Sequence, residues 1–64
     1  MKVNGQPVAL EQEQTLLQFL TALKYDCRTI AVECNGMIVP KAEYETICLR
    51  DEDTLEIVRF VGGG

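Results

Sequence analysis

Histidine is absent from this 64-residue chain, and the three cysteines, Cys27, Cys34 and Cys48, show no CxxC spacing. Histidine is a usual residue of zinc sites, of acid–base catalysis and of Cys–His nucleophilic catalysis, so its absence disfavours all three functions. We expect no metal site. An odd number of cysteines in a small chain disfavours a secreted disulfide scaffold and favours a reducing cytoplasm. We expect the thiols to fill apolar space rather than to react, because free Cys is among the most buried residue types.

Long apolar runs and clusters of basic residues are missing as well. No stretch approaches the roughly 20 apolar residues of a membrane span, and the first residues do not form a signal peptide. The six Lys and Arg are scattered through a chain of net charge −4, which argues against nucleic-acid binding and favours a partner with a basic docking face. We expect a cytoplasmic protein that is monomeric when free and binds neither membrane nor nucleic acid.

The length allows one domain with a thin margin of stability, because a chain of this size buries only about 60% of its unfolded surface. Hydrophobic residues make up 47% and charged residues 25%, the balance of an ordered globular domain. Such a domain leaves no room for a pocket lined by a full set of catalytic groups. It also has no phosphate-binding GxxxxGKS/T motif. We therefore expect a carrier or substrate protein rather than an enzyme, with no cofactor of its own.

The first ten residues predict a β-hairpin. Met1 and Val3 alternate with polar neighbours, and the alternation resumes at Val8 and Leu10. Between them, residues 4–7 (Asn-Gly-Gln-Pro) form a turn signature, since Asn-Gly tolerates the positive φ of tight hairpins.

One amphipathic helix follows the hairpin. Thr15 and Gln18 fit a capping box at its start. An apolar stripe then recurs at helical spacing for about three turns and ends near Lys24; it consists of Leu16, Leu17, Phe19, Leu20 and Leu23. The stripe predicts a helix that packs its leucines into the core.

The second half of the chain predicts three strands around two turns. Residues 30–34 form a strand that an Asn35-Gly36 turn joins to a short strand at 37–39. Pro40 ends this strand, because it cannot donate to a ladder.

An irregular or 3₁₀ connection at 41–46 carries Tyr44, and residues 47–49 predict a brief strand. A turn at 50–53 leads to the clearest strand, 54–61, which is rich in β-branched and aromatic residues. Together the elements predict an α+β roll in which the helix packs across one face of a mixed sheet of four to five strands. The domain spans 1–61, and residues 62–64 form a flexible glycine tail.

Gly62, Gly63 and Gly64 have no structural use that the sequence reveals, since glycine loses the most conformational entropy on ordering. Without Cβ atoms the tail can thread a narrow channel and carry its carboxylate roughly 13 Å from the sheet, at about 3.3–3.6 Å per residue. A carboxylate is inert to acyl transfer until a partner converts it to an acyl adenylate. We therefore expect Gly64 to be a substrate that other enzymes activate.

The last strand predicts a docking surface just before the tail. Leu55 and Ile57 fall on one face, whereas Val58 and Phe60 fall on the other, which the single helix cannot cover. We expect Val58, Phe60 and the adjoining Val61 to be gripped by partner enzymes, because exposed apolar patches mark interaction sites. The alternative is that they complete the core or a sheet edge. Arg59 is expected to be a solvated charge.

The order and spacing of several motifs resemble the ThiS sulfur carriers, which belong to the ubiquitin-like β-grasp superfamily and are related to MoaD. The resemblance covers the whole chain. Its motifs are Asn4-Gly5, Thr15-Leu16-Leu17, Val32-x-x-Asn35-Gly36-x-x-Val39-Pro40, Tyr44, and Leu49-x-Asp51-x-Asp53-x-Leu55-Glu56-Ile57-Val58 before the glycines. Two positions depart from the family pattern: Glu52 stands where glycine is common, and the tail has a third glycine.

The resemblance implies a role in making the thiazole of thiamine. A ThiF-type adenylyltransferase would activate Gly64 with ATP and magnesium. A cysteine desulfurase or another persulfide donor would then convert it to a thiocarboxylate, whose sulfur the thiazole synthase ThiG would take. Open alternatives are a carrier for molybdopterin, tRNA thiolation or cysteine synthesis, a ubiquitin-like modifier of lysines, and a non-covalent binding module.

Overall fold

The sheet is mixed and has five strands in the order β2-β1-β5-β3-β4 in the computed structural model, which describes residues 1–60. Only β1 and β5 pair in parallel, and the other neighbours are antiparallel. The strands are β1 (Lys2–Val3), β2 (Gln6–Pro7), β3 (Ile30–Cys34), β4 (Met37–Ile38) and β5 (Thr54–Arg59). This arrangement confirms the predicted mixed sheet and places β5 at its centre.

Both Asn-Gly pairs form the predicted turns. Asn4 and Gly5 have φ of 52° and 82°, and Asn35 and Gly36 have φ of 53° and 84°, the left-handed backbone that hairpin turns of two residues require. The first turn is shorter than predicted, because residues 6–7 belong to strand β2. The second strand therefore lies earlier than predicted, and Val8 and Leu10 fall after its end. Pro7 is tolerated there because β2 is an edge strand, where a missing N–H breaks no ladder bond.

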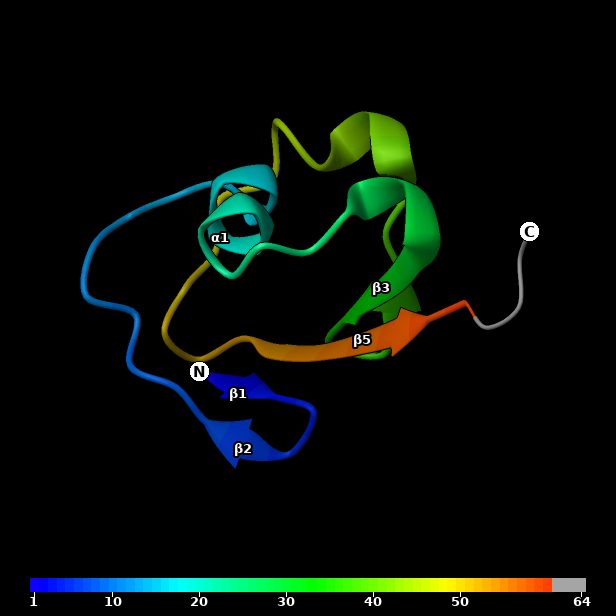
Figure 1. The fold of residues 1–64 in the computed structure, drawn as a ribbon. Coiled ribbons are helices and arrows are strands. Elements are labelled where there is room, and N and C mark those ends of the chain that lie inside the picture. Colours follow the sequence, from blue (N-terminus) through cyan, green and yellow to red (C-terminus); the bar gives the residue numbers. More distant parts are fainter. Residues whose placement is uncertain (61–64) are drawn as a thin grey trace.

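Helix α1 (Leu16–Ala22) lies across one face of the sheet (Figure 1). The predicted capping box is present: the Gln18 amide donates to Thr15 Oγ1 over 3.1 Å, and the Thr15 amide donates to Gln18 Oε1 over 2.9 Å. The helix is shorter than the three turns predicted, since Lys24 adopts a positive φ of 66°. Leu23 therefore leaves the buried stripe and is 50% exposed.

Two 3₁₀ segments connect the larger elements. Segment η2 (Lys41–Glu43) confirms the predicted irregular connection and leads into the buried Tyr44. Segment η1 (Cys27–Thr29) was not predicted; the Asp26 side chain caps it by accepting from the Arg28 amide. The strand predicted at 47–49 is wrong, because this segment pairs with the irregular residues before α1 and makes only an isolated bridge between Cys48 and Thr15.

The core lies between α1 and the inner face of the sheet. Its largest fully buried side chains are Leu16, Leu20, Ile30, Val32 and Leu55. The cysteines fill this core less than expected: Cys27 and Cys34 are half-buried at its margin, and Cys48 is exposed. No helix among residues 1–60 has the length and apolar character needed to cross a bilayer.

Candidate functional site: the outer face and carboxyl end of strand β5

Strand β5 presents two different faces, as its alternation predicts. Leu55 and Ile57 point into the core and are 0% and 8% exposed, whereas Val58 and Phe60 are each 55% exposed. The prediction that Val58 and Phe60 lie on the uncovered face is confirmed. The third predicted docking residue, Val61, and the tail glycines Gly62, Gly63 and Gly64 lie outside the described residues.

The apolar surface extends beyond the residues that the sequence predicted. Val58 lies opposite Ala31 on β3, and Glu33 of β3 lies opposite Ile38 on β4, which is 73% exposed. Directly opposite residues of neighbouring strands share a face. We name Ala31, Ile38, Val58 and Phe60 the outer patch.

Backbone hydrogen bonding continues one residue beyond Arg59, where β5 ends. The Phe60 amide donates to the carbonyl of Thr29, the last residue of η1 directly before β3, over 2.8 Å, so the backbone is still held at the last described residue. The backbone is therefore anchored as far as Phe60, which lies in the outer patch and directly precedes Val61 in the sequence.

The amino end of β5 is held by a buried network. Asp53 is 9% exposed, and its carboxylate accepts from Asn35 Nδ2 over 3.0 Å and from the Arg50 amide over 2.8 Å. Asn35 Oδ1 in turn accepts from the Thr54 amide over 3.0 Å. The acidic turn and the Asn35-Gly36 turn are thus tied together where β5 begins.

The other Asn-Gly turn also binds β5. Asn4 Oδ1 accepts from the Ile57 amide over 2.7 Å, and the Asn4 amide donates to the Leu55 carbonyl over 2.9 Å. The Asn-Gly pattern predicted only the backbone turns, and these side-chain contacts of Asn4 and Asn35 were not predicted. Glu52 is not among the positive-φ residues of the described chain, so its place in the acidic turn carries no backbone strain.

Two cations lie over aromatic rings at the carboxyl end of β5. Lys41 Nζ is 5.8 Å from the centre of the Phe60 ring, and the Arg59 guanidinium carbon is 5.8 Å from the centre of the Tyr25 ring. These distances fall within the range of cation–π attraction. Arg59 is exposed as expected, but its charge is oriented by Tyr25 rather than free in solvent.

One aspartate at each end of β5 has a lowered pKa. Hydrogen bonds from the Arg28 side chain and then from its amide lower the pKa of the Asp26 carboxyl below its usual value of 3.8. Hydrogen bonds from the Met1 amine and the Leu10 amide do the same for Asp51. Burial, followed by the charge of Asp53, raises the pKa of the Cys34 thiol, which keeps that thiol protonated and weakly nucleophilic.

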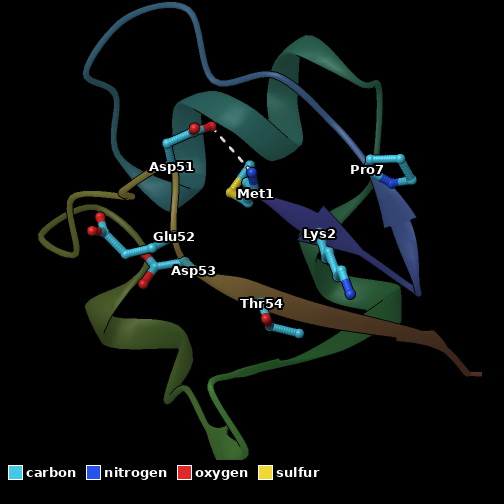
Figure 2. Close-up of a pocket in the computed structure, with 7 residues that line it drawn as sticks. All are labelled: Met1, Lys2, Pro7, Asp51, Glu52, Asp53 and Thr54. Carbon is cyan, nitrogen blue, oxygen red and sulfur yellow. Dashed lines mark hydrogen bonds and ion pairs between the residues drawn. The ribbon is translucent and has the colours of Figure 1, made fainter.

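A shallow hollow of about 360 Å³ lies at the amino end of β5 and is lined in part by Met1, Lys2 and Thr54. Figure 2 shows that Asp51 at its rim points toward the Met1 amine, and the two groups form an ion pair of 3.1 Å. Among residues 1–60, no three His, Cys, Asp or Glu side chains gather as metal ligands would. The hollow is open, and two of its three acids, Asp51 and Asp53, are already engaged, so it offers no converging reactive groups.

Comparison with known proteins adds the family. The model of the ThiS family matches residues 1–64. The sulfur carrier protein ThiS of Bacillus subtilis is 34% identical, over 100% of this chain and 98% of that protein. The crystal structure of the thiamine biosynthesis protein ThiS from Geobacter metallireducens superposes with a TM-score of 0.83 at 29% identity, covering 98% of this chain and 96% of that one.

A second kind of relative is much longer. A thiazole synthase of Paramagnetospirillum magneticum is 42% identical over 97% of this chain, but the match spans only 19% of that protein. A thiazole synthase of Magnetococcus marinus matches in the same way, at 36% identity. In these proteins, a segment similar to this chain is part of the same polypeptide as the remainder of the synthase.

Proposed function

This chain belongs to the ThiS family, and we propose that it is a sulfur carrier of thiamine biosynthesis whose sulfur is held as a thiocarboxylate on Gly64. The family match, which runs through the glycine end of the chain, carries this proposal. The β-grasp body supports it, because β5 ends at Arg59, shortly before Gly62, Gly63 and Gly64 in the sequence.

In the proposed reaction, the chain supplies the carboxylate of Gly64 and a binding surface, and its partner enzymes catalyse each step. A ThiF-type adenylyltransferase uses ATP and magnesium to convert the Gly64 carboxylate to an acyl adenylate, whose AMP is a good leaving group. The terminal sulfur of a persulfide on a cysteine desulfurase or a related donor displaces AMP and forms an acyl disulfide. A second thiol then attacks the donor cysteine sulfur, forms a disulfide with it and releases the thiocarboxylate. The thiazole synthase ThiG then receives the sulfur.

The outer patch is the proposed binding surface for both the ThiF-type enzyme and the thiazole synthase ThiG. Val58 and Phe60 sit immediately before Val61 and the glycines, and Ile38 widens the apolar area on the same face. Aromatic side chains at the centre of an interface contribute much of its binding energy. A partner that holds this face also fixes the direction in which the tail enters its active site.

Thiamine is favoured over the other carrier pathways by the longer relatives, since a segment similar to this chain occurs inside proteins named thiazole synthase. Carriers for molybdopterin, tRNA thiolation or cysteine synthesis, and lysine modifiers, would use the same fold and tail. The chain acts as a co-substrate rather than an enzyme and binds no cofactor itself. The free thiols of Cys27, Cys34 and Cys48 support a reducing compartment such as the cytoplasm.

Intact-mass spectrometry tests the proposal. The chain is incubated with ATP, magnesium, the ThiF-type enzyme of the same organism, a persulfide donor and a thiol reductant. We expect a mass gain equal to the exchange of one oxygen for sulfur, and none when Gly64 is deleted. Adducts of the chain on other proteins would instead identify a modifier. A tight complex without any mass change would identify a binding module.

A further inference from the structure

The carboxyl end of β5 carries positive charge on a chain whose net charge is −4. We propose that Lys41 and Arg59, which we name the basic collar, dock against carboxylate side chains that surround the tail channel of the activating enzyme. This inference rests on the proposed function, and it reverses the sequence-based expectation that an acidic chain meets a basic docking face.

The collar flanks the last residues of β5 on two sides. Phe60, under Lys41, continues the outer face that includes Val58, whereas Arg59 alternates to the opposite face and lies over Tyr25. Both rings restrict where the charges can be, which lowers the entropy lost when the charges meet a partner. The cations therefore lie at the last two described residues, Lys41 over the ring of Phe60 and Arg59 in the chain itself.

The collar is not neutralised by the described part of the chain. Neither Lys41 nor Arg59 forms an ion pair with a carboxylate of residues 1–60. The nearby Asp26 already holds Arg28 through bonds of 3.2 and 3.1 Å to its side chain. The two collar charges therefore remain available to a partner.

Negative charge gathers at the other end of the same face and strand. Glu33 and Glu56 lie directly opposite each other on the outer face, and Asp51, Glu52 and Asp53 form the turn before β5. Like charges directly opposite on a sheet are unfavourable, so the Glu pair contributes no stability that would explain its presence. With cations at one end and acids at the other, a partner of matching polarity can bind the outer patch in only one direction.

Carboxylates of the partner suit the collar better than the phosphate of the acyl adenylate. Adenylation occurs at Gly64, four residues beyond Phe60. A chain extended through a channel spans about 13 Å over that length, at roughly 3.3–3.6 Å per residue. Cations held over Phe60 and Tyr25 lie at the mouth of such a channel rather than at the reacting carboxyl group.

Charge reversal tests the collar. The double variant Lys41→Glu/Arg59→Glu is compared with Lys2→Glu/Arg50→Glu, which makes the same change in net charge at the amino end of β5, where both side chains are exposed. Adenylation by the ThiF-type enzyme is followed at several salt concentrations. We expect the collar variant to raise KM about tenfold or more at low salt with kcat retained, and the difference to shrink as salt screens the charges. The control variant should stay within about twofold of the wild type, because its charges lie outside the docking end.

The proposal is overturned if both double variants raise KM equally, if neither does, or if the collar variant lowers kcat at unchanged KM, which would indicate contact with the adenylate. Lys41→Gln/Arg59→Gln, which should give a smaller rise in KM, replaces the reversal if circular dichroism shows that the reversal unfolds the chain. If the wild type is not adenylated at all, the proposed function fails. Equilibrium binding of the same variants to the enzyme then decides whether the collar contacts it.

Discussion

The two ends of strand β5 are built for different tasks. At the amino end, Asp53 is buried and accepts hydrogen bonds from the Asn35 side chain and the Arg50 amide. In the hollow beside it, the Asp51 carboxylate is already paired with the Met1 amine. At the carboxyl end, Phe60 is 55% exposed and carries a cation over its ring. Polar groups that are satisfied within the chain hold the fold, whereas exposed apolar groups and cations without an ion-pair partner within residues 1–60 remain for other proteins.

This division explains how so small a domain serves as a carrier. Its stability depends on a short list of buried side chains between α1 and the inner face of the sheet. The outer face is left free because one helix covers only one side of the sheet (Figure 1). Substitutions at the anchored end should therefore change stability, and those at the exposed end should change partner reactions.

The largest expected effect on stability comes from Leu55, which is fully buried at the anchored end. Leu55→Ala should lower the free energy of unfolding by about 2–5 kcal/mol, because it removes apolar contacts and leaves a cavity. Val58→Ala, on the exposed face of the same strand, should change it by no more than about 0.5 kcal/mol. Urea unfolding of both variants measures the difference, and equal losses would contradict the division of β5 into two faces.

A smaller loss is expected when the anchoring network is cut. Asp53→Ala leaves Asn35 Nδ2 and the Arg50 amide without their acceptor, which should cost about 1–3 kcal/mol. Thermal unfolding checks this value. Glu52→Ala, in the same turn but exposed, is the matched control and should melt like the wild type. Asp53→Ala should leave the KM for adenylation unchanged wherever the chain is still folded.

Phe60→Ser should show the opposite pattern. Loss of the exposed ring at the carboxyl end should raise the KM for adenylation about tenfold, which corresponds to about 1.4 kcal/mol of binding energy. The melting temperature should stay near that of the wild type. Leu23→Ser, which removes another half-exposed apolar side chain away from β5, controls for general hydrophobicity. Unchanged adenylation kinetics for Phe60→Ser would contradict the proposal that the activating enzyme binds the outer patch.

The smallest expected effect is the loss of stability at low pH when one aspartate near each end of β5 is protonated. Asp26 and Asp51 both have a pKa below the usual 3.8. Their contribution to stability is therefore fully present above that value and is lost as the pH falls through the lowered pKa. Both are exposed, so the loss should be slight. Carboxyl NMR titration should find both groups ionised below pH 3.8, and Arg28→Ala should return Asp26, but not Asp51, toward its usual pKa.

Local signals predicted most of the fold. The Asn-Gly pairs, the Thr15–Gln18 capping box and the alternation of β5 each depend on neighbours a few residues apart, and each appears as expected. The helix ends close to the predicted Lys24, but α1 is shorter than three turns because it stops at Ala22, and the last residue of the apolar stripe, Leu23, already forms its cap. Periodicity indicates where a helix is amphipathic but does not reveal where its backbone turns.

The site was predictable only in part, for a similar reason. Alternation within one strand identified Val58 and Phe60. Ile38 joins them through cross-strand register, Asn35 meets Asp53 across 18 positions, and Lys41 reaches Phe60 from a separate segment. Such tertiary contacts between distant residues leave no spacing signal in a single sequence.

Tandem mass spectrometry of the sulfur-loaded chain tests the central claim most directly. We expect one oxygen to be exchanged for sulfur in the terminal fragment that contains Gly64, and a Cys48→Ser variant to load equally well. The exposed Cys48 is the obvious competitor as a sulfur acceptor. A whole added sulfur atom located at Cys48 as a persulfide, with an unchanged Gly64, would contradict the account.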